Sequence, residues 1–367
     1  FLMHKTKMSN NNVSNDKKER NDNLQTEIQY GCLIIDMINE LINNKSSFFS
    51  VEYYPPKTGK GVDTLKKRIP NMIKWGPIFC DITWGAGGST SELTVNIANY
   101  IQNNNILNGN CNMHLTCTNM EKNKVDIALN EAKNIGIKNI VALRGDPPHG
   151  ESKWKAIDTG FSCALDLIKY IKLKYNNYFN ISCAGYPEGH PLVRKVINDP
   201  DWNSNTNEPF YWAPYYNDKT GKWEGVSAHD WQKELLYLKS KVDAGASMII
   251  TQLFYDEMLF INFVKECRNI GIKCPILPGI MPITNYKLFY KMTGFCKTVI
   301  PDILKQKLES IKHDSNAVFR FGVKYVSNMC NNILNYTIDN NEIFYGLHLY
   351  CMNQERAVIN LIKNIPK

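Results

Sequence analysis

The sequence predicts one α/β domain of the (β/α)8 TIM barrel class, with a helix in front of it and one long loop insertion. Two observations lead to this prediction. Short apolar runs rich in β-branched and aromatic residues alternate with longer amphipathic stretches, which is typical of parallel strands joined by helices. Eight such runs can be counted, and eight parallel strands close into this barrel.

The eight predicted strands are evenly spaced at first. They are residues 48–54, 77–84, 112–117, 139–146, 181–187, 248–255, 275–281 and 344–350. Each of the first four has a polar residue near its end: Glu52, Thr83, His114 and Asp146. These residues follow one another at intervals of 31, 31 and 32 positions, which is about the length of a βα unit.

The later spacing predicts an insertion between the fifth and sixth strands. Tyr186 follows Asp146 after 40 residues, and Gln252 follows Tyr186 after a further 66. The extra length covers about residues 192–228, where turn-forming residues are mixed with aromatic ones. We expect an ordered surface excursion rather than a second domain, and we expect it to be peripheral to the reaction.

A doubly wound sheet is the competing architecture for alternating strands and helices. Such sheets normally carry a phosphate-binding glycine loop directly after the first strand. No GxGxxG or GxxxxGK pattern follows residues 48–54, and this favours the barrel.

The region before the first strand divides into two parts. Residues 1–26 are rich in Asn, Lys and Asp with few apolar side chains, so we expect them to be disordered. From Ile28 to Leu41 apolar residues recur at helical spacing, which predicts an amphipathic helix that could close the bottom of the barrel. The catalytic domain is therefore expected to span residues 27–367.

Composition indicates a folded cytosolic protein. Of the 367 residues 43 % are hydrophobic, enough for a sizeable core, yet no run approaches the 18 or so apolar residues of a membrane span. The first residues also lack the apolar stretch of a secretion signal. The eleven cysteines are scattered without a CxxC pair, so we expect them to be reduced and mostly buried.

The net charge of +8 does not indicate nucleic-acid binding, because lysine and arginine are spread through every segment. A mildly basic cleft for small anionic ligands is the better interpretation. We expect small-molecule partners, a homo-oligomer, no nucleic acid and no membrane.

In a (β/α)8 barrel the active site lies at the carboxyl ends of the strands, so polar residues there should converge on one mouth. The sequence supplies two carboxylates, an imidazole, an amide and hydroxyls at these positions: Glu52, Thr83, His114, Asp146, Tyr186, Gln252 and Tyr350. They do not form a known metal-ligand pattern. We therefore expect an organic cofactor and no metal.

Nine segments resemble, in order, the motif series of methylenetetrahydrofolate reductases. They are FFSVEYYPPKT, DITWGAGGST, MHLTC, ALRGDPP, AGYPEGHP, KVDAGASMIITQLFYD, CPILPGIMPI, MTGFCKT and GLHLYCMN, and together they cover about residues 47–360. The resemblance implies a (β/α)8 barrel with non-covalent FAD that passes hydride from NADH or NADPH to the folate. The motif sequences are more similar to those of eukaryotic members, which usually carry a regulatory domain after the barrel. Because the sequence ends at Lys367, we expect this chain to lack that domain.

The resemblance also implies a role for each residue of the mouth. Glu52 is the implied catalytic acid and Asp146 the carboxylate beside the flavin ring, and both would contact the folate. Gln252 is implied to bind the pterin, and Tyr350 to help. Twelve residues are implied to contact FAD: Thr83, Trp84, His114, Arg144, Gly145, Asp146, Cys163, Ala164, Tyr186, His190, Glu234 and Lys241. Of these, Glu234 is implied to bind the adenosine ribose and Lys241 to lie near the phosphates.

Each assignment has a structural alternative that the residues alone leave open. Glu52 could pair with an inner lysine or arginine, because an unpaired buried carboxylate is costly. His114 could be a satisfied core residue, Gln252 a structural cross-link, and residues 144–146 a capped turn. Glu234 and Lys241, seven residues apart, could form a solvated helix face.

Three places depart from the common family pattern. Cys163 stands where an aromatic hydroxyl often contacts the flavin, and Gln354 stands where some members have Arg. Leu192 and Val193 replace the Glu and Ala of the family's His-Pro-Glu-Ala motif. These departures affect details of FAD and folate-tail binding. The alternatives to a reductase of this family are another FAD barrel dehydrogenase, such as one for proline, and a flavin-binding subunit without catalysis.

Overall fold

The computed structural model describes residues 32–85, 91–147, 154–338 and 342–365. The chain divides into two units, Phe1–Tyr30 and Gly31–Lys367, and every element below belongs to the second. The disorder predicted for residues 1–26 and the first positions of the predicted helix fall outside the described residues.

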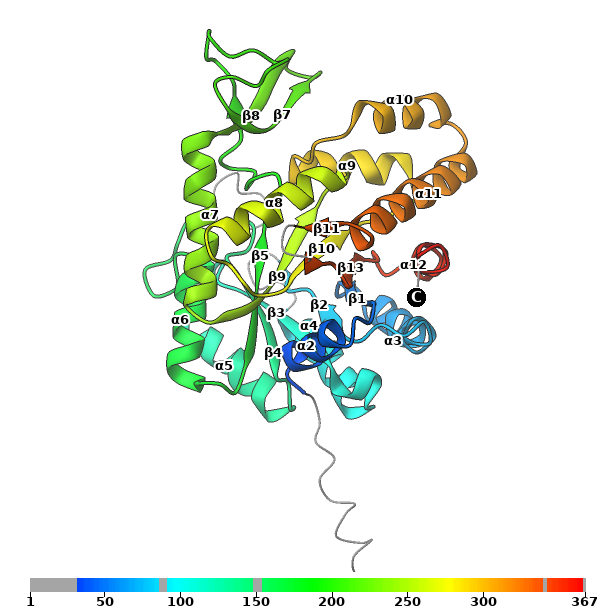
Figure 1. The fold of residues 1–367 in the computed structure, drawn as a ribbon. Coiled ribbons are helices and arrows are strands. Elements are labelled where there is room, and N and C mark those ends of the chain that lie inside the picture. The colour runs from blue at the N-terminus through cyan, green and yellow to red at the C-terminus, as the bar shows by residue number, and fades with distance from the viewer. Residues whose placement is uncertain (1–31, 86–90, 148–153, 339–341, 366–367) are drawn as a thin grey trace, which may run out of the picture. The chain divides into compact units, whose positions relative to one another are not determined.

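Eight parallel strands close into a barrel in the order β1-β13-β10-β9-β5-β4-β3-β2 (Figure 1). They are β1 (Phe48–Tyr53), β2 (Cys80–Ile82), β3 (Cys111–Thr116), β4 (Asn139–Leu143), β5 (Asn180–Gly185), β9 (Ala246–Leu253), β10 (Ile276–Ile280) and β13 (Gly346–Tyr350). Each coincides with one predicted run to within a few residues. The predicted (β/α)8 fold is therefore confirmed, with the chain visiting the strands in sequence around the ring.

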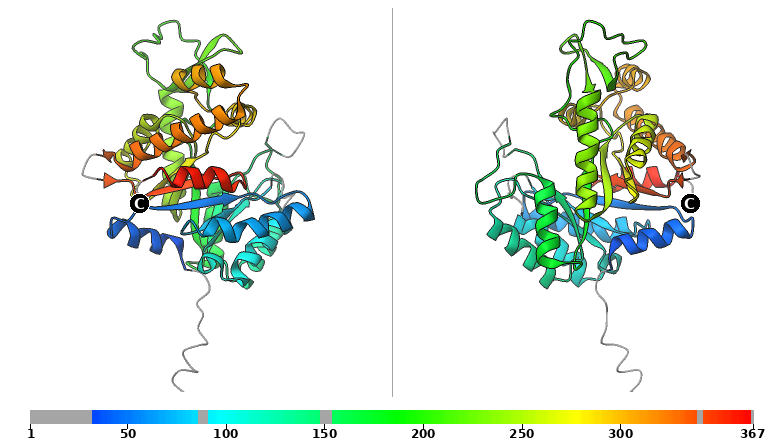
Figure 2. Two further views of the ribbon diagram at one scale, coloured as in Figure 1. Left: turned by 90° about the vertical axis from the view of Figure 1, so that its right-hand side faces the viewer. Right: turned by 60° about the vertical axis from the view of Figure 1, so that its left-hand side comes forward.

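Helices lie outside the strands in both views of Figure 2. Their apolar residues recur every three or four positions, so one face of each can pack on the sheet; in α3 this face is Val62, Leu65, Ile69 and Met72. The helices are α3 (Gly59–Ile73), α4 (Ser91–Asn103), α5 (Lys122–Asn134), α6 (Ala164–Tyr175), α7 (Ala228–Asp243), α8 (Glu257–Asn269), α9 (Tyr286–Cys296), α10 (Asp302–Ile311), α11 (Ser315–Leu334) and α12 (Glu355–Ile362).

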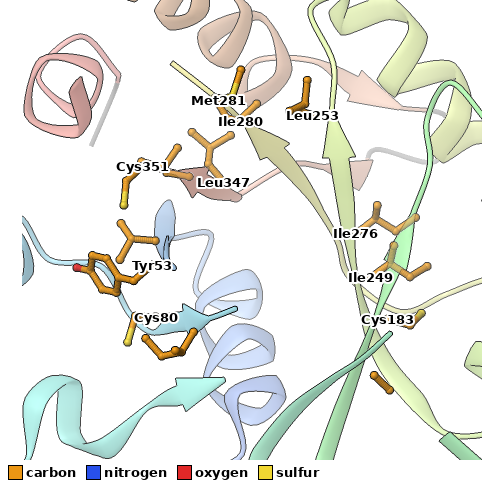
Figure 3. Packing of buried hydrophobic residues seen from close by; sticks show 14 of the residues in the cluster. Tyr53, Cys80, Cys183, Ile249, Leu253, Ile276, Ile280, Met281, Leu347 and Cys351 are labelled. Carbon is orange, nitrogen blue, oxygen red and sulfur yellow. The ribbon is translucent and has the colours of Figure 1, made fainter. Parts of the chain in front are cut away.

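Three further short elements lie in the connections between barrel strands. The 3-10 helix η2 (Ile106–Gly109) precedes β3, and an antiparallel pair, β11 (Thr337–Ile338) and β12 (Glu342–Ile343), precedes β13. The core joins strand residues from opposite sides of the barrel, among them Tyr53, Cys183, Ile249, Ile276 and Leu347 (Figure 3). All five are buried, so the barrel strands are held by packing as well as by their backbone hydrogen bonds.

The helix α2 (Ile34–Asn43) covers the amino ends of the barrel strands. Its Ile34 and Ile38 are fully buried in a cluster with Phe48 and Phe79, at the starts of β1 and β2. The Asn139 side chain at the start of β4 accepts a hydrogen bond from the Ile34 N–H at 2.8 Å. The predicted helix thus closes this end of the barrel, and the opposite end holds the mouth.

The insertion between β5 and β9 contains a three-stranded antiparallel sheet, ordered β6-β8-β7. Its strands are β6 (Lys195–Val196), β7 (Tyr211–Asn217) and β8 (Lys222–Ser227). Figure 1 shows β7 and β8 above the amino end of α7, on the side away from α2. The excursion predicted for residues 192–228 is therefore a small sheet next to the barrel mouth.

All eleven cysteines are free thiols, and Cys32 is the one with an exposed side chain. Seven of the others are buried, as expected. Within the described part of the chain, none of the helices combines the length and apolar character that crossing a membrane requires.

Candidate active site

A cavity of about 720 Å³ opens at the carboxyl ends of the barrel strands. This volume lies within the range of small-molecule sites, ~300 to 1,000 Å³. Every residue that the sequence assigned to the site lines it: Glu52, Thr83, Trp84, His114, Arg144, Gly145, Asp146, Cys163, Ala164, Tyr186, His190, Glu234, Lys241, Gln252 and Tyr350. The structure therefore brings the whole predicted set together, while the role of each residue remains a prediction.

Glu52, Asp81 and His114 form an acid and imidazole cluster on three adjacent strands. Because β1 and β2 pair in register, Glu52 is the neighbour of Asp81. His114 Nε2 lies 2.9 Å from Asp81 Oδ2 and 3.6 Å from Glu52 Oε2. Burial by itself lowers the pKa of His114, but the hydrogen bond to Asp81 and the Glu52 carboxylate outweigh it, so the pKa is raised.

His348 of β13 completes this cluster from the other side of Glu52. Its Nδ1 is 2.8 Å from Ser50 Oγ, and its Nε2 lies 3.6 Å from Glu52 Oε2. The His348 side chain is fully buried, and its Nε2 has no hydrogen-bond partner among the described residues. Glu52 is thus flanked by two imidazoles, and no lysine or arginine of the described residues forms an ion pair with it.

The donor atoms of Glu52, Asp81 and His114 lie within 4.8 Å of one another, which is close enough for a shared metal ion. The sequence analysis did not predict this cluster, because Asp81 was not among the expected site residues. The hydrogen bond between Asp81 and His114 already pairs two of the three donors. The expectation that the site uses no metal stays a prediction.

Arg144, Gly145 and Asp146 follow β4 on another side of the cavity. Gly145 has φ +88°, and a Cβ there would lie 2.5 Å from Thr118 Oγ1, so this position requires glycine. The Arg144 guanidinium lies 5.3 Å from the centre of the Trp154 ring. Burial raises the pKa of Asp146, and the Arg144 charge opposes this rise.

The loop 186–190 follows β5 and places two aromatic rings in the cavity wall. Tyr186 and His190 make an edge contact with ring centres 4.7 Å apart. The Glu234 carboxylate accepts a hydrogen bond from the His190 backbone N–H at 3.2 Å. Burial and the nearby Arg144, Lys241 and Lys297 lower the pKa of His190 to about 4, so this imidazole is neutral near pH 7.

Lys241 is buried, although it belongs to the last turn of α7. Its Nζ donates a hydrogen bond to the Ala184 carbonyl at 2.6 Å. The solvated helix face that the spacing of Glu234 and Lys241 allowed is therefore wrong for this lysine. A cationic side chain in a buried cavity wall is suited to an anionic ligand, because opposite charges attract more strongly where water is excluded.

Gln252 and Tyr350 lie on strands that flank β10. The Tyr350 hydroxyl donates to the Thr251 carbonyl at 2.6 Å, and its ring passes over Gly279, where a Cβ would come within 2.6 Å of it. Burial and the Glu52 carboxylate raise the pKa of Tyr350 well above its usual range. Among the described residues, the hydrogen bond that Gln252 Oε1 accepts is a local one, from the Leu253 N–H at 2.8 Å.

The remaining predicted residues complete the wall. Thr83 and Trp84 follow β2, and the Trp84 indole N–H is buried without a partner among the described residues. Cys163 and Ala164 stand at the start of α6, where the Cys163 side chain does not cap the helix. An indole donor without a partner in a cavity wall is available to a ligand.

Sequence reasoning missed Asp81, His348 and Ser50. The signal that could have found them is the strand period of two, since alternate residues face the same side of a sheet. Asp81 is two residues before Thr83, His348 is two before Tyr350, and Ser50 is two before Glu52. The prediction used one polar residue near the end of each strand and so left out its neighbours two positions earlier.

The chain is similar to known proteins over most of its length. The family model described as methylenetetrahydrofolate reductase matches residues 37–366. The chain is 46 % identical over 332 residues to a probable methylenetetrahydrofolate reductase (NADH) of Oryza sativa, and 44 % identical over 333 residues to methylenetetrahydrofolate reductase (NADH) 1 of Arabidopsis thaliana. Each match covers 90 % of this chain and 50 % of the relative, so the chain spans about half the length of these curated relatives.

Among solved structures, the fold is similar to an uncharacterized protein from Clostridium thermocellum described as binding two copies of 5-methyl-5,6,7,8-tetrahydrofolic acid. The TM-score is 0.56 at 13 % identity, over 89 % of this chain and 97 % of that one. At this identity the likeness concerns the fold alone. The family model, which spans all eight barrel strands, shows that this chain belongs to the methylenetetrahydrofolate reductase family.

Proposed function

We propose that this chain reduces 5,10-methylenetetrahydrofolate to 5-methyltetrahydrofolate with electrons from NADH or NADPH carried by bound FAD. The observation that carries the proposal is the Glu52 carboxyl group between two imidazoles at the bottom of a cavity that a family member would use for folate. A cytosolic location and a homo-oligomer belong to the same proposal. Both come from sequence patterns.

The residues present fit FAD. The cavity is large enough for the flavin with a second ring stacked on it, and its basic side carries the buried Lys241 and the half-buried Arg144. The buried indole N–H groups of Trp84 and Trp231 have no partner among the described residues and can serve a polar ligand. When bound, FAD supplies the two-electron chemistry that side chains cannot.

In this proposal Glu52 protonates the folate so that its five-membered ring opens to an iminium, which then accepts hydride at the methylene carbon. The side chain is 19 % exposed, so it reaches the cavity while mostly shielded from water. His114, whose pKa is raised, attracts this carboxylate across 3.6 Å, and His348 Nε2 lies at the same distance from it. General acid catalysis needs such a fixed carboxyl group within reach of the substrate.

Both substrates would use the same face of the site in turn. The barrel is closed by α2 at its other end, so the nicotinamide and the folate have to enter through one mouth. We therefore propose a ping-pong sequence, with Gln252 orienting the pterin and Tyr350 packing beside it. The two relatives named above carry NADH in their names, and this favours NADH as the donor.

The test uses the purified protein mixed with FAD under anaerobic conditions. We expect a yellow complex that bleaches with NADH or NADPH and regains its colour with methylenetetrahydrofolate, with methyltetrahydrofolate detected by mass spectrometry. Bleaching without recovery by the folate would favour another FAD barrel dehydrogenase. A protein that binds FAD but is not bleached would be a flavin-binding subunit, and one that binds no FAD would refute the proposal.

A further inference from the structure

We propose that the insertion sheet, β6 to β8 with the adjoining Arg194, is a positioning element that holds the loop 186–190 in its ligand-binding conformation. Tyr186 and His190, at the two ends of this loop, line the cavity. Each of the three residues between them contacts a different residue of the insertion. The inference rests on the proposed function only in taking FAD as the ligand of this loop.

The first contact joins Trp212 of β7 to Pro187. The indole Nε1 donates a hydrogen bond to the Pro187 carbonyl at 2.7 Å. The same indole stacks on Trp231 of α7, with ring centres 4.1 Å apart and an interplanar angle of 7°. Because Trp231 lines the cavity, Trp212 fixes the loop against a part of the wall itself.

The second contact joins Arg194 to Glu188. The buried guanidinium donates from Nη1 to the Glu188 carbonyl at 2.7 Å and from Nη2 to the Ala213 carbonyl of β7 at 2.8 Å. It also lies 4.8 Å from the centre of the Tyr215 ring. One fully enclosed side chain thus links the loop to the central part of β7.

The third contact is steric and involves Gly189. This residue has φ +82°, and a Cβ there would lie 2.7 Å from Cγ2 of Val226 in β8. Val226 is fully buried, so the sheet packs directly on the loop backbone without a gap. All three residues between Tyr186 and His190 are therefore held from the insertion side.

A loop held in this way loses less conformational entropy when its ligand binds, so the ligand binds more tightly. Inside the loop itself, the Gly189 N–H donates to the Tyr186 carbonyl at 2.9 Å, a single turn hydrogen bond. This contribution is compatible with the prediction that the insertion is peripheral to the reaction, and it adds a role in cofactor binding. It predicts that the insertion affects cofactor affinity without supplying an atom to the reaction.

The test is Trp212→Phe, which keeps an aromatic ring for the stack but removes the donor to Pro187. The matched control is Trp202→Phe, because the Trp202 indole donates instead to Asn207 Oδ1 at 3.0 Å, inside the insertion. We expect Trp212→Phe to speed amide hydrogen exchange of residues 186–190 in the FAD-free protein and to raise the Kd for FAD about 3- to 30-fold. At saturating FAD its kcat should stay within about twofold of wild type.

The control should leave both the exchange of residues 186–190 and the FAD affinity unchanged. Equal behaviour of the two variants would overturn the inference. If Trp212→Phe fails to fold, Val226→Ala, which opens space over Gly189, should give the same two changes. If the wild-type protein binds no FAD, the proposed function fails, while the exchange comparison still decides whether the insertion positions the loop.

Discussion

His114 and His190 line the same cavity, but their surroundings carry opposite charge. The carboxylates of Asp81 and Glu52 raise the pKa of His114 against the effect of burial. Burial and three cations, Arg144, Lys241 and Lys297, lower the pKa of His190 to about 4. We call the side of the mouth on β1, β2, β3 and β13 the acid half, and the side around β4, β5 and α7, where these cations lie together with the carboxylates of Asp146 and Glu234, the basic half. Proton transfer is suited to the first half and anion binding to the second.

The largest effect expected from this division is that of Glu52→Gln, which keeps the shape of the side chain but cannot donate a proton. The folate half-reaction should slow by ~100- to 10,000-fold, the usual range for a lost general acid. Flavin reduction by the nicotinamide should stay within about tenfold of wild type, because it needs no proton from Glu52. Stopped-flow absorbance separates the two. If the folate half-reaction runs at the wild-type rate, Glu52 is not the acid. If both half-reactions fail and FAD is lost, Glu52 has a structural role.

The basic half is tested by Lys241→Met, which keeps most of the length of the side chain and removes its charge. We expect a ~10- to 100-fold weaker affinity for FAD, measured by fluorescence titration, from the loss of a charge-assisted contact. The control is Lys239→Met on the same helix, where the lysine forms a surface pair with Asp243 at 2.8 Å. If both variants bind FAD like wild type, Lys241 does not face the ligand.

Asp81→Asn tests the acid half without touching Glu52. The substitution removes the carboxylate that hydrogen-bonds His114, so the pKa of His114 should fall, as NMR titration of the imidazole can show. The folate half-reaction should slow by about tenfold, since His114 then holds Glu52 less firmly. Asp126→Asn, which breaks a surface pair with Lys174, is the control. A His114 pKa that does not move would show that Glu52 alone sets it.

The smallest expected effect is on acid stability in the FAD-free protein. The pKa of His190 is about 4 in the folded chain and 6.5 in its ordinary state, so folding favours the neutral imidazole. The stability that follows is present above pH 6.5 and is lost as the pH falls toward 4. Between pH 7 and pH 5 the free energy of unfolding, measured with urea, should therefore fall by about 1 to 2 kcal/mol less in His190→Asn than in wild type. The control is His229→Asn at an exposed position. Its free energy of unfolding should fall as much as that of wild type.

The sequence was sufficient to predict the barrel because the pattern of strands and helices is local. Each strand needs only a short apolar run, and its place in the ring follows from its order in the chain. The mouth residues were predictable for the same reason, since the carboxyl ends of parallel strands meet at one edge. Glu52 and His114 were both found in this way, and the structure brings them to 3.6 Å.

What the sequence did not reveal depends on three-dimensional contacts. The alternating side-chain direction of β2 carries Asp81 into the cluster, but the run itself gives no reason to prefer Asp81 over Thr83. Lys241 occupies a position in α7 that could equally face solvent, and its burial depends on how the helix packs on β5. The hydrogen bond from Trp212 to Pro187 spans 25 residues and joins a strand of the insertion sheet to a loop, which no periodicity predicts.

The burial of the cysteines determines how the protein responds to thiol-modifying reagents. Burial raises the pKa of Cys117, Cys296 and Cys351 to about 12, so these groups hold almost no thiolate at neutral pH, the form that reacts with alkylating agents. Partial burial also raises the pKa of Cys32, but this residue is exposed, and it lies beside α2 at the closed end of the barrel. A maleimide dye should therefore attach there first, and it would report on the protein without entering the mouth.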